Sequence, residues 1–252
     1  MSGLETIFAT IINFFAALLF GMLGVGAAPV FIPTIQSLGY GIVTTVFPLA
    51  ILLNGINSSF ALIPFAKARS VDWRGGAMLS IVAAVFAFTG AYFAFDIPAR
   101  TLLYFLAAVL ILLSAWTFAR VKREGSSARP SGRRIALIAL PASAFAGFVG
   151  GLLAIGGGGI LVPFLLMSGY NTKNASGTTA LVATVASAAG FLGFISHATI
   201  PLDLLLYSTV AIAVASVLGA WLSIKLAKPS WLRLLLGLIL LASALKTIIT
   251  LV

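Results

Sequence analysis

Long apolar segments with short polar separators set the pattern of this chain. The apolar segments fall at about residues 4–38, 41–66, 75–95, 100–120, 133–168, 171–199, 203–226 and 230–251. A helix needs roughly 20 apolar residues to cross a lipid bilayer, so the pattern predicts an all-α integral membrane protein. The composition agrees, because 61% of the 252 residues are hydrophobic and 8% are charged, whereas a soluble domain carries about 25% charged residues.

The one sizeable polar stretch, residues 120–134, is rich in glycine, serine, proline and basic residues. That composition is typical of a flexible linker. It divides the chain into a first membrane repeat, 1–119, and a second membrane repeat, 135–252, with four apolar segments in each. Such a linker would allow one half to rock against the other.

The two halves share landmarks at a constant offset of 130 residues, or 131 after one inserted residue. The corresponding positions are Gly26 and Gly156, Pro33 and Pro163, Gly39-Tyr40 and Gly169-Tyr170, Ala50 and Ala180, Asp72 and Asp203, and Pro98 and Pro229. Two unrelated hydrophobic halves would not keep these landmarks in register, so the pattern indicates a duplication. Duplicated halves are common in secondary transporters, which bind substrate where the repeats meet.

The first segment of each half is about 35 residues long, which is too long for one span and too short for two. Glycines interrupt both, at Gly21, Gly24 and Gly26 in the first and at Gly147, Gly150, Gly151 and Gly156 to Gly159 in the second. Each glycine weakens a helix by about 1 kcal/mol, and broken backbone within a membrane needs shielding by protein or by a watery cavity. We expect a discontinuous or re-entrant helix at the start of each half.

The net charge of +10 comes from fifteen Lys and Arg against five Asp and Glu. In a membrane protein this excess marks cytoplasmic loops rather than a nucleic-acid partner. If all eight segments cross, ten basic residues lie inside; if segments 4–38 and 133–168 dip in and return, thirteen lie inside and only Arg100 and Lys246 lie outside. The positive-inside rule favours the second topology. It makes the halves inverted repeats, with a cytoplasmic linker and both termini outside.

The chain offers little for catalysis or metal binding. It has no cysteine, one histidine and five acids, which all lie at segment ends. We therefore expect no enzyme activity, no metal site, no cofactor and no buried carboxylate for a cation. The lone histidine, His197, could sense pH or assist proton coupling, or it could be purely structural.

The broken helices suggest an anion site instead. A helix that restarts after GVGAAP (Gly24 to Pro29) or AIGGGG (Ala154 to Gly159) presents unpaired N–H groups and the positive end of its dipole. Pro29 and Pro163 suit the early turns of such helices. Hydroxyl and amide groups of segments 41–66 and 171–199 could complete a neutral cage, although each could equally bond its own helix or join two helices. The predicted substrate-binding residues are Gly24, Gly26, Ala27, Ala28, Asn57, Gly156, Gly157, Gly158, Gly159, Thr178, Thr179 and Ser187.

The second half carries the most specific sequence, AIGGGGILVPFLLMSGYNTKNASGTTALVATVASAAGF, from Ala154 to Phe191. It resembles the signature of the sulfite exporter TauE/SafE family: a Gly-rich turn, hydrophobic-Pro, Leu-Gly, and then Ala-x-Gly-Thr-Ser/Thr before a long span. The first half, GMLGVGAAPVFIPTIQSLGY, is similar but departs from it. Ala27-Ala28 stand where glycines are usual, and Thr44 to Pro48 replace the Ala-x-Gly-Thr element.

The resemblance implies a multi-pass carrier in a bacterial or archaeal inner membrane. Its substrate would be a small sulfur-containing anion such as sulfite or an organosulfonate, moved by alternating access and most simply exported. The alternatives are a carrier for an unrelated small metabolite and a non-transporting membrane scaffold.

Overall fold

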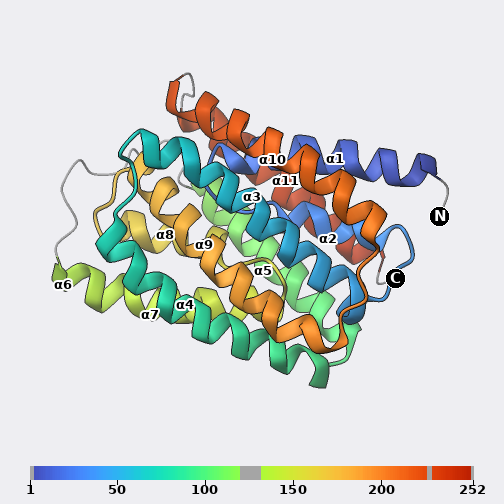
Figure 1. The fold of residues 1–252 in the computed structure, drawn as a ribbon. Helices are drawn as coiled ribbons and strands as arrows, with labels where there is room; N and C mark the ends of the chain where they lie inside the picture. The colour runs from blue at the N-terminus through green and yellow to red at the C-terminus, as the bar shows by residue number, and fades with distance from the viewer. Residues whose placement is uncertain (1–2, 120–131, 226–228, 251–252) are drawn as a thin grey trace.

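The computed structural model describes residues 3–119, 132–225 and 229–250, and all regular secondary structure in these ranges is helical (Figure 1). The first-half elements are α1 (Gly3–Gly21), α2 (Ala28–Gln36), a π-helical turn η1 (Ile42–Val46), α3 (Phe47–Lys67), α4 (Trp73–Phe93), a 3₁₀ turn η2 (Ala94–Asp96) and α5 (Ala99–Ala119). The second-half elements are α6 (Gly132–Arg134), a π-helical turn η3 (Ile135–Ala139), α7 (Leu140–Leu152), α8 (Gly158–Met167), α9 (Thr172–Phe194), a 3₁₀ turn η4 (Ile195–His197), α10 (Leu202–Lys225) and α11 (Pro229–Ile249). Most of the predicted linker lies outside the described residues.

Seven helical stretches of the described ranges are long and apolar enough to cross a membrane. They begin at Leu4, Ile42, Trp73, Ala99, Gly132, Thr172 and Leu202. Many of their large apolar side chains face outward, including Phe8, Val85 and Leu112. An apolar exterior is what lipid requires, so the prediction of an all-α integral membrane protein is confirmed.

Both predicted helix breaks are present. The chain leaves helical geometry between Gly21 and Ala28, and again between Leu152 and Gly158. Gly24, Gly156 and Gly157 have φ of 65°, 68° and 69°, a left-handed conformation that favours glycine. Two short helices, α2 and α8, follow the breaks.

Three glycines expected to interrupt the second segment do not. Gly147, Gly150 and Gly151 lie within α7, which ends only at Leu152. A Cβ on Gly147 or Gly151 would overlap the backbone of α4 at Ala83 or Ala87. Close helix packing therefore explains these two glycines better than a break does.

The two prolines also differ in placement. Pro29 lies in the first turn of α2, as expected, whereas Pro163 lies inside α8. Pro33, its counterpart in the first half, likewise lies inside α2.

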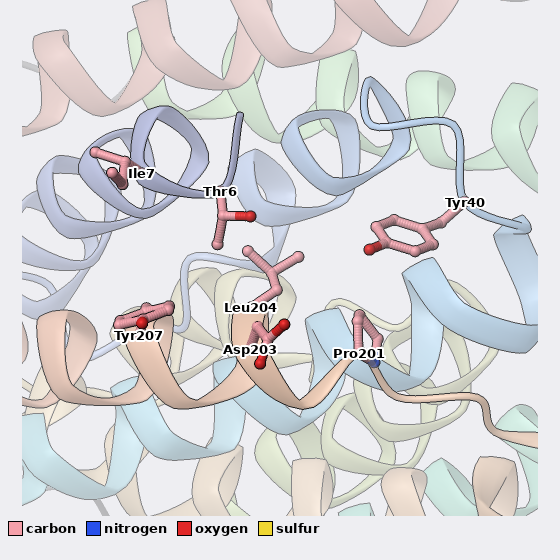
Figure 2. A pocket seen from close by; sticks show the side chains of 7 residues that line it. All are labelled: Thr6, Ile7, Tyr40, Pro201, Asp203, Leu204 and Tyr207. Carbon is pink, nitrogen blue, oxygen red and sulfur yellow. The ribbon is translucent and has the colours of Figure 1, made fainter. Parts of the chain in front are cut away.

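The helices lie side by side along one direction, so the bundle has two ends (Figure 1). At the Asp72 end, the α3–α4 and α8–α9 connections meet where Tyr170 Oη donates to Asp72 Oδ2 at 2.7 Å. At the Asp203 end, Thr6 near the start of α1 lines a pocket with Asp203 and with Tyr40, which follows α2 (Figure 2). The first broken segment thus begins and ends at one end of the bundle. The inverted relationship of the halves stays a prediction.

Helices of the two halves pack against each other rather than forming separate bodies. First-half α4 contacts α7 and α9, while α1 contacts second-half α10. Helix α3 contacts both α9 and α10, and α5 contacts α11. This interleaving places the two helix breaks next to each other in the interior of the bundle.

Candidate functional site

One side chain, Asn54 of α3, lies between the two helix breaks. Its Oδ1 accepts a hydrogen bond from the backbone N–H of Ala28, at 3.0 Å, and so caps the start of α2. Its Nδ2 donates to Ser187 Oγ of α9, also at 3.0 Å. Asn54 is completely buried, and an amide that both accepts and donates is the group such a position requires.

Glycines allow both breaks to approach this amide. A Cβ on Gly26 would overlap Asn54, and a Cβ on Gly156 would overlap Nδ2 of Asn54. That second Cβ would also lie 2.5 Å from Ser187 Oγ. The backbone of both breaks therefore lies directly against the Asn54 side chain, with no Cβ atom in between.

The start of α8 supplies hydrogen-bond donors. Within the described ranges, the backbone N–H groups of Gly157, Gly158 and Gly159 donate to no protein acceptor. They form the N-terminus of a ten-residue helix, where the dipole favours negative charge. Glycine at these positions adds no side chain over the N–H groups, and the Gly157 nitrogen itself packs closely on Gly150 of α7.

One face of α9 follows this second break. Thr179, Ala183 and Ser187 are spaced by four residues and so share a face. Ser187 lies beside Gly156, while a Cβ on Gly158 would meet Ala183 Cβ at 3.1 Å and Thr179 Cγ2 at 3.3 Å. The Thr179 hydroxyl is buried and has no hydrogen-bond partner in the structure. A buried hydroxyl without a partner is costly, which a bound acceptor would relieve.

The surroundings are polar but uncharged. Among the residues that the structure describes, the buried polar side chains are Asn, Ser and Thr, apart from Tyr170 at the Asp72 end, and no Asp, Glu, Lys, Arg or His side chain is buried. In the same ranges, no group of three His, Asp or Glu side chains could hold a metal ion. The site can therefore offer a ligand hydrogen bonds and helix dipoles, but no full charge.

Several of the predicted residues meet at this place. Gly26 and Gly156 adjoin Asn54, Ala28 is capped by it, and Ser187 bonds to it. Gly157 and Ala27 are the N-cap residues of α8 and α2. Gly158 and Thr179 lie next to each other beside this place, and a Cβ on Gly159 would lie 3.8 Å from Leu113 Cδ1.

Three predicted residues lie elsewhere. Gly24 packs on the backbone of Ser176. Thr178 accepts a hydrogen bond from the backbone N–H of Asp72, at 3.1 Å, near the Asp72 end. Asn57 donates both Nδ2 hydrogens, to Ala17 O at 3.1 Å and to Ser216 Oγ at 2.8 Å, and so joins α3 to α1 and α10.

His197 is remote from the helix breaks. It is exposed near the Asp203 end, with its ring 4.6 Å from that of Phe95 and its Nδ1 2.9 Å from Ser196 Oγ. This placement gives it no contact with Asn54 or with α8.

Asn54 is the residue that the sequence-based selection missed. It is one of two amides in α3, three residues apart, and the helix is buried on most sides, with residues from Phe47 to Phe65 enclosed. Periodicity therefore gives no sign of which amide faces the breaks. The available signal was chemical: a helix that restarts near Ala27 needs an acceptor for its first N–H groups, and the side chain of Ala27 offers none.

Comparisons with known proteins agree with this architecture. A family model described as "Sulfite exporter TauE/SafE" matches residues 9–247. A probable membrane transporter protein of Sinorhizobium fredii is 27% identical over 250 residues, covering 96% of this chain and 98% of that protein. One of Methanocaldococcus jannaschii is 24% identical over 196 residues, covering 73% of this chain and 72% of that protein. No solved structure matches the chain.

Proposed function

The chain belongs to the sulfite exporter TauE/SafE family, and from this premise we propose that it is a secondary transporter of a small sulfur-containing anion. The substrate would be sulfite or an organosulfonate, carried across the cell membrane by alternating access. The observation that supports the proposal is the meeting of two helix N-termini at Asn54, in a buried site without a charged side chain.

The donors suit a sulfonate or sulfite head group. Its oxygens accept hydrogen bonds, and the N–H groups of Gly157 to Gly159, the Asn54 amide and the Thr179 hydroxyl are donors on neighbouring elements. If a substrate oxygen replaced Ser187 Oγ as the acceptor, the Asn54 Nδ2 group would donate to the substrate instead. The helix break, α3 and α9 would then each donate a hydrogen bond to the substrate from an uncharged group.

The size of the helix dipoles favours a singly charged substrate. Each helix N-terminus is equivalent to about half a positive charge, so α2 and α8 together offset about one negative charge. A dianion such as sulfate would keep an uncompensated charge in the membrane interior, which is costly. We therefore expect organosulfonates and hydrogen sulfite to bind more strongly than sulfate.

Export is the expected direction. An inside-negative potential drives an anion outward by about 2.3 kcal/mol per charge per 100 mV, so export needs no second gradient. In this proposal the Asp72 end and the linker face the cytoplasm of a bacterial or archaeal cell.

Flux into proteoliposomes tests the substrate. Radiolabelled sulfite uptake is measured with and without an imposed potential or pH gradient, against excess sulfate, thiosulfate or a short organosulfonate. We expect uptake that depends on the protein, is driven by a positive interior and is inhibited more by the organosulfonate than by sulfate. Absence of both sulfite flux and inhibition by any sulfur anion would contradict the proposed substrate class.

A further inference from the structure

A tyrosine–aspartate pair joins two connections at the Asp72 end. Tyr170, at the α8–α9 connection, is 1% exposed and donates through Oη to Asp72 Oδ2, at 2.7 Å. Asp72 is also the N-cap of α4, where its Oδ1 accepts from Gly75 N at 3.0 Å. Burial and the hydrogen bond with Asp72 raise the pKa of the Tyr170 hydroxyl far above its ordinary value, so it remains a donor at neutral pH.

Further contacts tighten this end. Thr178 Oγ1 accepts from Asp72 N at 3.1 Å, and Gly177 packs on the backbone of Ser70. Gly75 lies so close that a Cβ there would be 2.9 Å from Tyr170 Oη. The α3–α4 connection is thus joined to the start of α9, across the boundary between the halves.

The repeat places the same two residue types at the opposite end. Tyr40 corresponds to Tyr170 at the offset of 130, and Asp203 corresponds to Asp72 at 131. Their environment differs, because both line an open pocket of about 660 Å³ at the Asp203 end. Figure 2 shows the Tyr40 ring set apart from the Asp203 carboxylate, which lies next to Leu204, with Tyr207 farther along α10. Tyr40 is half-buried and Asp203 is exposed, whereas Tyr170 is buried and Asp72 half-buried.

We infer that the two pairs are alternating gates: Tyr170 with Asp72 closes the Asp72 end, and Tyr40 with Asp203 closes the Asp203 end in the opposite conformation. This inference rests on the proposed transport function. Equivalent residues in unequal environments are what a duplicated carrier requires when one end is closed and the other open. In the opposite conformation, Tyr40 and Asp203 would be buried together and Tyr170 and Asp72 would line an open pocket.

The Tyr40–Asp203 pair lacks the counterparts of two residues that support the Tyr170–Asp72 pair. Pro48 stands where Thr178 stands in the other half, and Leu206 stands where Gly75 stands. Proline has no hydroxyl to accept from Asp203 N, and leucine prevents the approach that Gly75 permits. The Asp203 end therefore closes less firmly, in agreement with its open pocket in this structure.

Cysteine accessibility tests the gates without any substrate. The chain has no cysteine, so Ser70→Cys reports on the buried Asp72 end, and Thr6→Cys reports on the pocket. Each is placed in the otherwise unchanged protein and in Tyr170→Phe, and labelled with a water-soluble maleimide in permeabilised membranes. Loss of the hydrogen bond to a charged group should change the balance of states by about tenfold. Labelling at residue 70 should rise by that order while labelling at residue 6 falls.

Two further variants keep the test specific. Asp203→Asn should leave labelling at residue 70 unchanged or lower, because it weakens closure of the other end. Tyr104→Phe removes a hydroxyl from an exposed position of α5 and should change neither rate. If Tyr170→Phe raises labelling at both positions or at neither, the gate is refuted, even if sulfite flux is intact. Reciprocal labelling without sulfur-anion flux would instead support the gates and reject the substrate.

Discussion

At the scale of single residues, Asn54 joins parts of the chain that are far apart in sequence. Its amide bridges the start of α2, 26 residues earlier, and Ser187 of α9, 133 residues later. A serine or threonine hydroxyl also accepts and donates, but through a single oxygen on a shorter side chain, whereas Asn54 reaches its two partners with two separate atoms, Oδ1 and Nδ2. Asn54 thus connects the proposed site to both halves.

We expect Asn54→Ala to reduce sulfite flux by at least about tenfold and to lower stability by about 1–3 kcal/mol, because Ala28 N–H and Ser187 lose their partner. Asn13→Ala is the matched control. Asn13 is an equally buried amide of α1 that donates to Ser208 at 3.3 Å, away from the breaks. Melting in detergent should show similar destabilisation for both, and only the Asn54 variant should lose flux. Equal flux loss in both variants would assign Asn54 a purely structural role.

Gly156 is tested by adding a single methyl group. In Gly156→Ala the new Cβ would enter the space of Asn54 and Ser187, at a residue whose φ is 68°. Gly39→Ala imposes the same kind of backbone strain, at φ 82°, with nothing within 4 Å of its Cβ. Both variants should lose about 1–2 kcal/mol from the left-handed conformation, while flux should disappear only in Gly156→Ala. Normal flux in Gly156→Ala would exclude the break from substrate binding.

At the scale of elements, small residues allow the backbones of different halves to approach. Gly147 and Gly151 of α7 pack on Ala83 and Ala87 of α4, as the four-residue spacing of small residues predicts. Gly219 of α10 packs in the same way on Leu18 of α1. These two equivalent contacts fix α7 and α10 against the opposite half.

Gly151→Ala should separate α7 from α4, because its Cβ would overlap the Ala87 carbonyl. Overpacking of this kind typically lowers stability by about 1–3 kcal/mol, which should appear as a lower melting temperature in detergent. Gly132→Ala is the control, since it also lies in a helix and has nothing within 4 Å of its Cβ. Comparable melting temperatures for the two variants would show that the close approach of α7 and α4 is unimportant.

Sequence reasoning located the elements better than their contacts. Glycine composition identified both breaks, because left-handed backbone is a local property that glycine favours. The same composition placed a break at Gly147 to Gly151, where tertiary packing keeps the helix intact. The choice of Asn57 over Asn54 had a similar origin, since the rotation of a buried helix is fixed by its neighbours. Thr178 bonds near the Asp72 end for a comparable reason, which the spacing of polar residues does not encode.

At the scale of the whole molecule, basic residues gather at one end. Lys67, Arg69, Arg74, Lys173 and Lys225 lie on the elements that meet at the Asp72 end, where Lys173 Nζ donates to Ile224 O at 3.3 Å. Arg100 and Lys246 lie on α5 and α11, toward the opposite end. The positive-inside rule would place the Asp72 end in the cytoplasm, and this orientation stays a prediction.

Surface labelling of intact cells tests this orientation. A cysteine at exposed Thr199, near the Asp203 end, should react with a membrane-impermeant maleimide from outside. A cysteine at exposed Lys173, near the Asp72 end, should react only after permeabilisation. The reverse pattern would invert the orientation, and with it the expected direction of transport.

The moving units of such a carrier are better described by packing than by sequence. Helix α10 packs on α1 and α3, and α4 packs on α7 and α9, so each set has members from both halves, while the packing of α3 on α9 joins the two sets. Motion between these sets would preserve the contacts of α7 with α4 and of α10 with α1. Motion of one half against the other, as the linker first suggested, would break both.

The interleaving of the halves also determines how the protein can be made. Helices α1 to α5 enter the membrane during synthesis before α7, α9 and α10 exist. Until then, the small-residue faces of α1 and α4 have no partner, and Asn54 has no Ser187 to bond. The first half must therefore persist in the bilayer as an incomplete bundle. The native structure forms only when α7, α9 and α10 are inserted and pack against the helices of the first half.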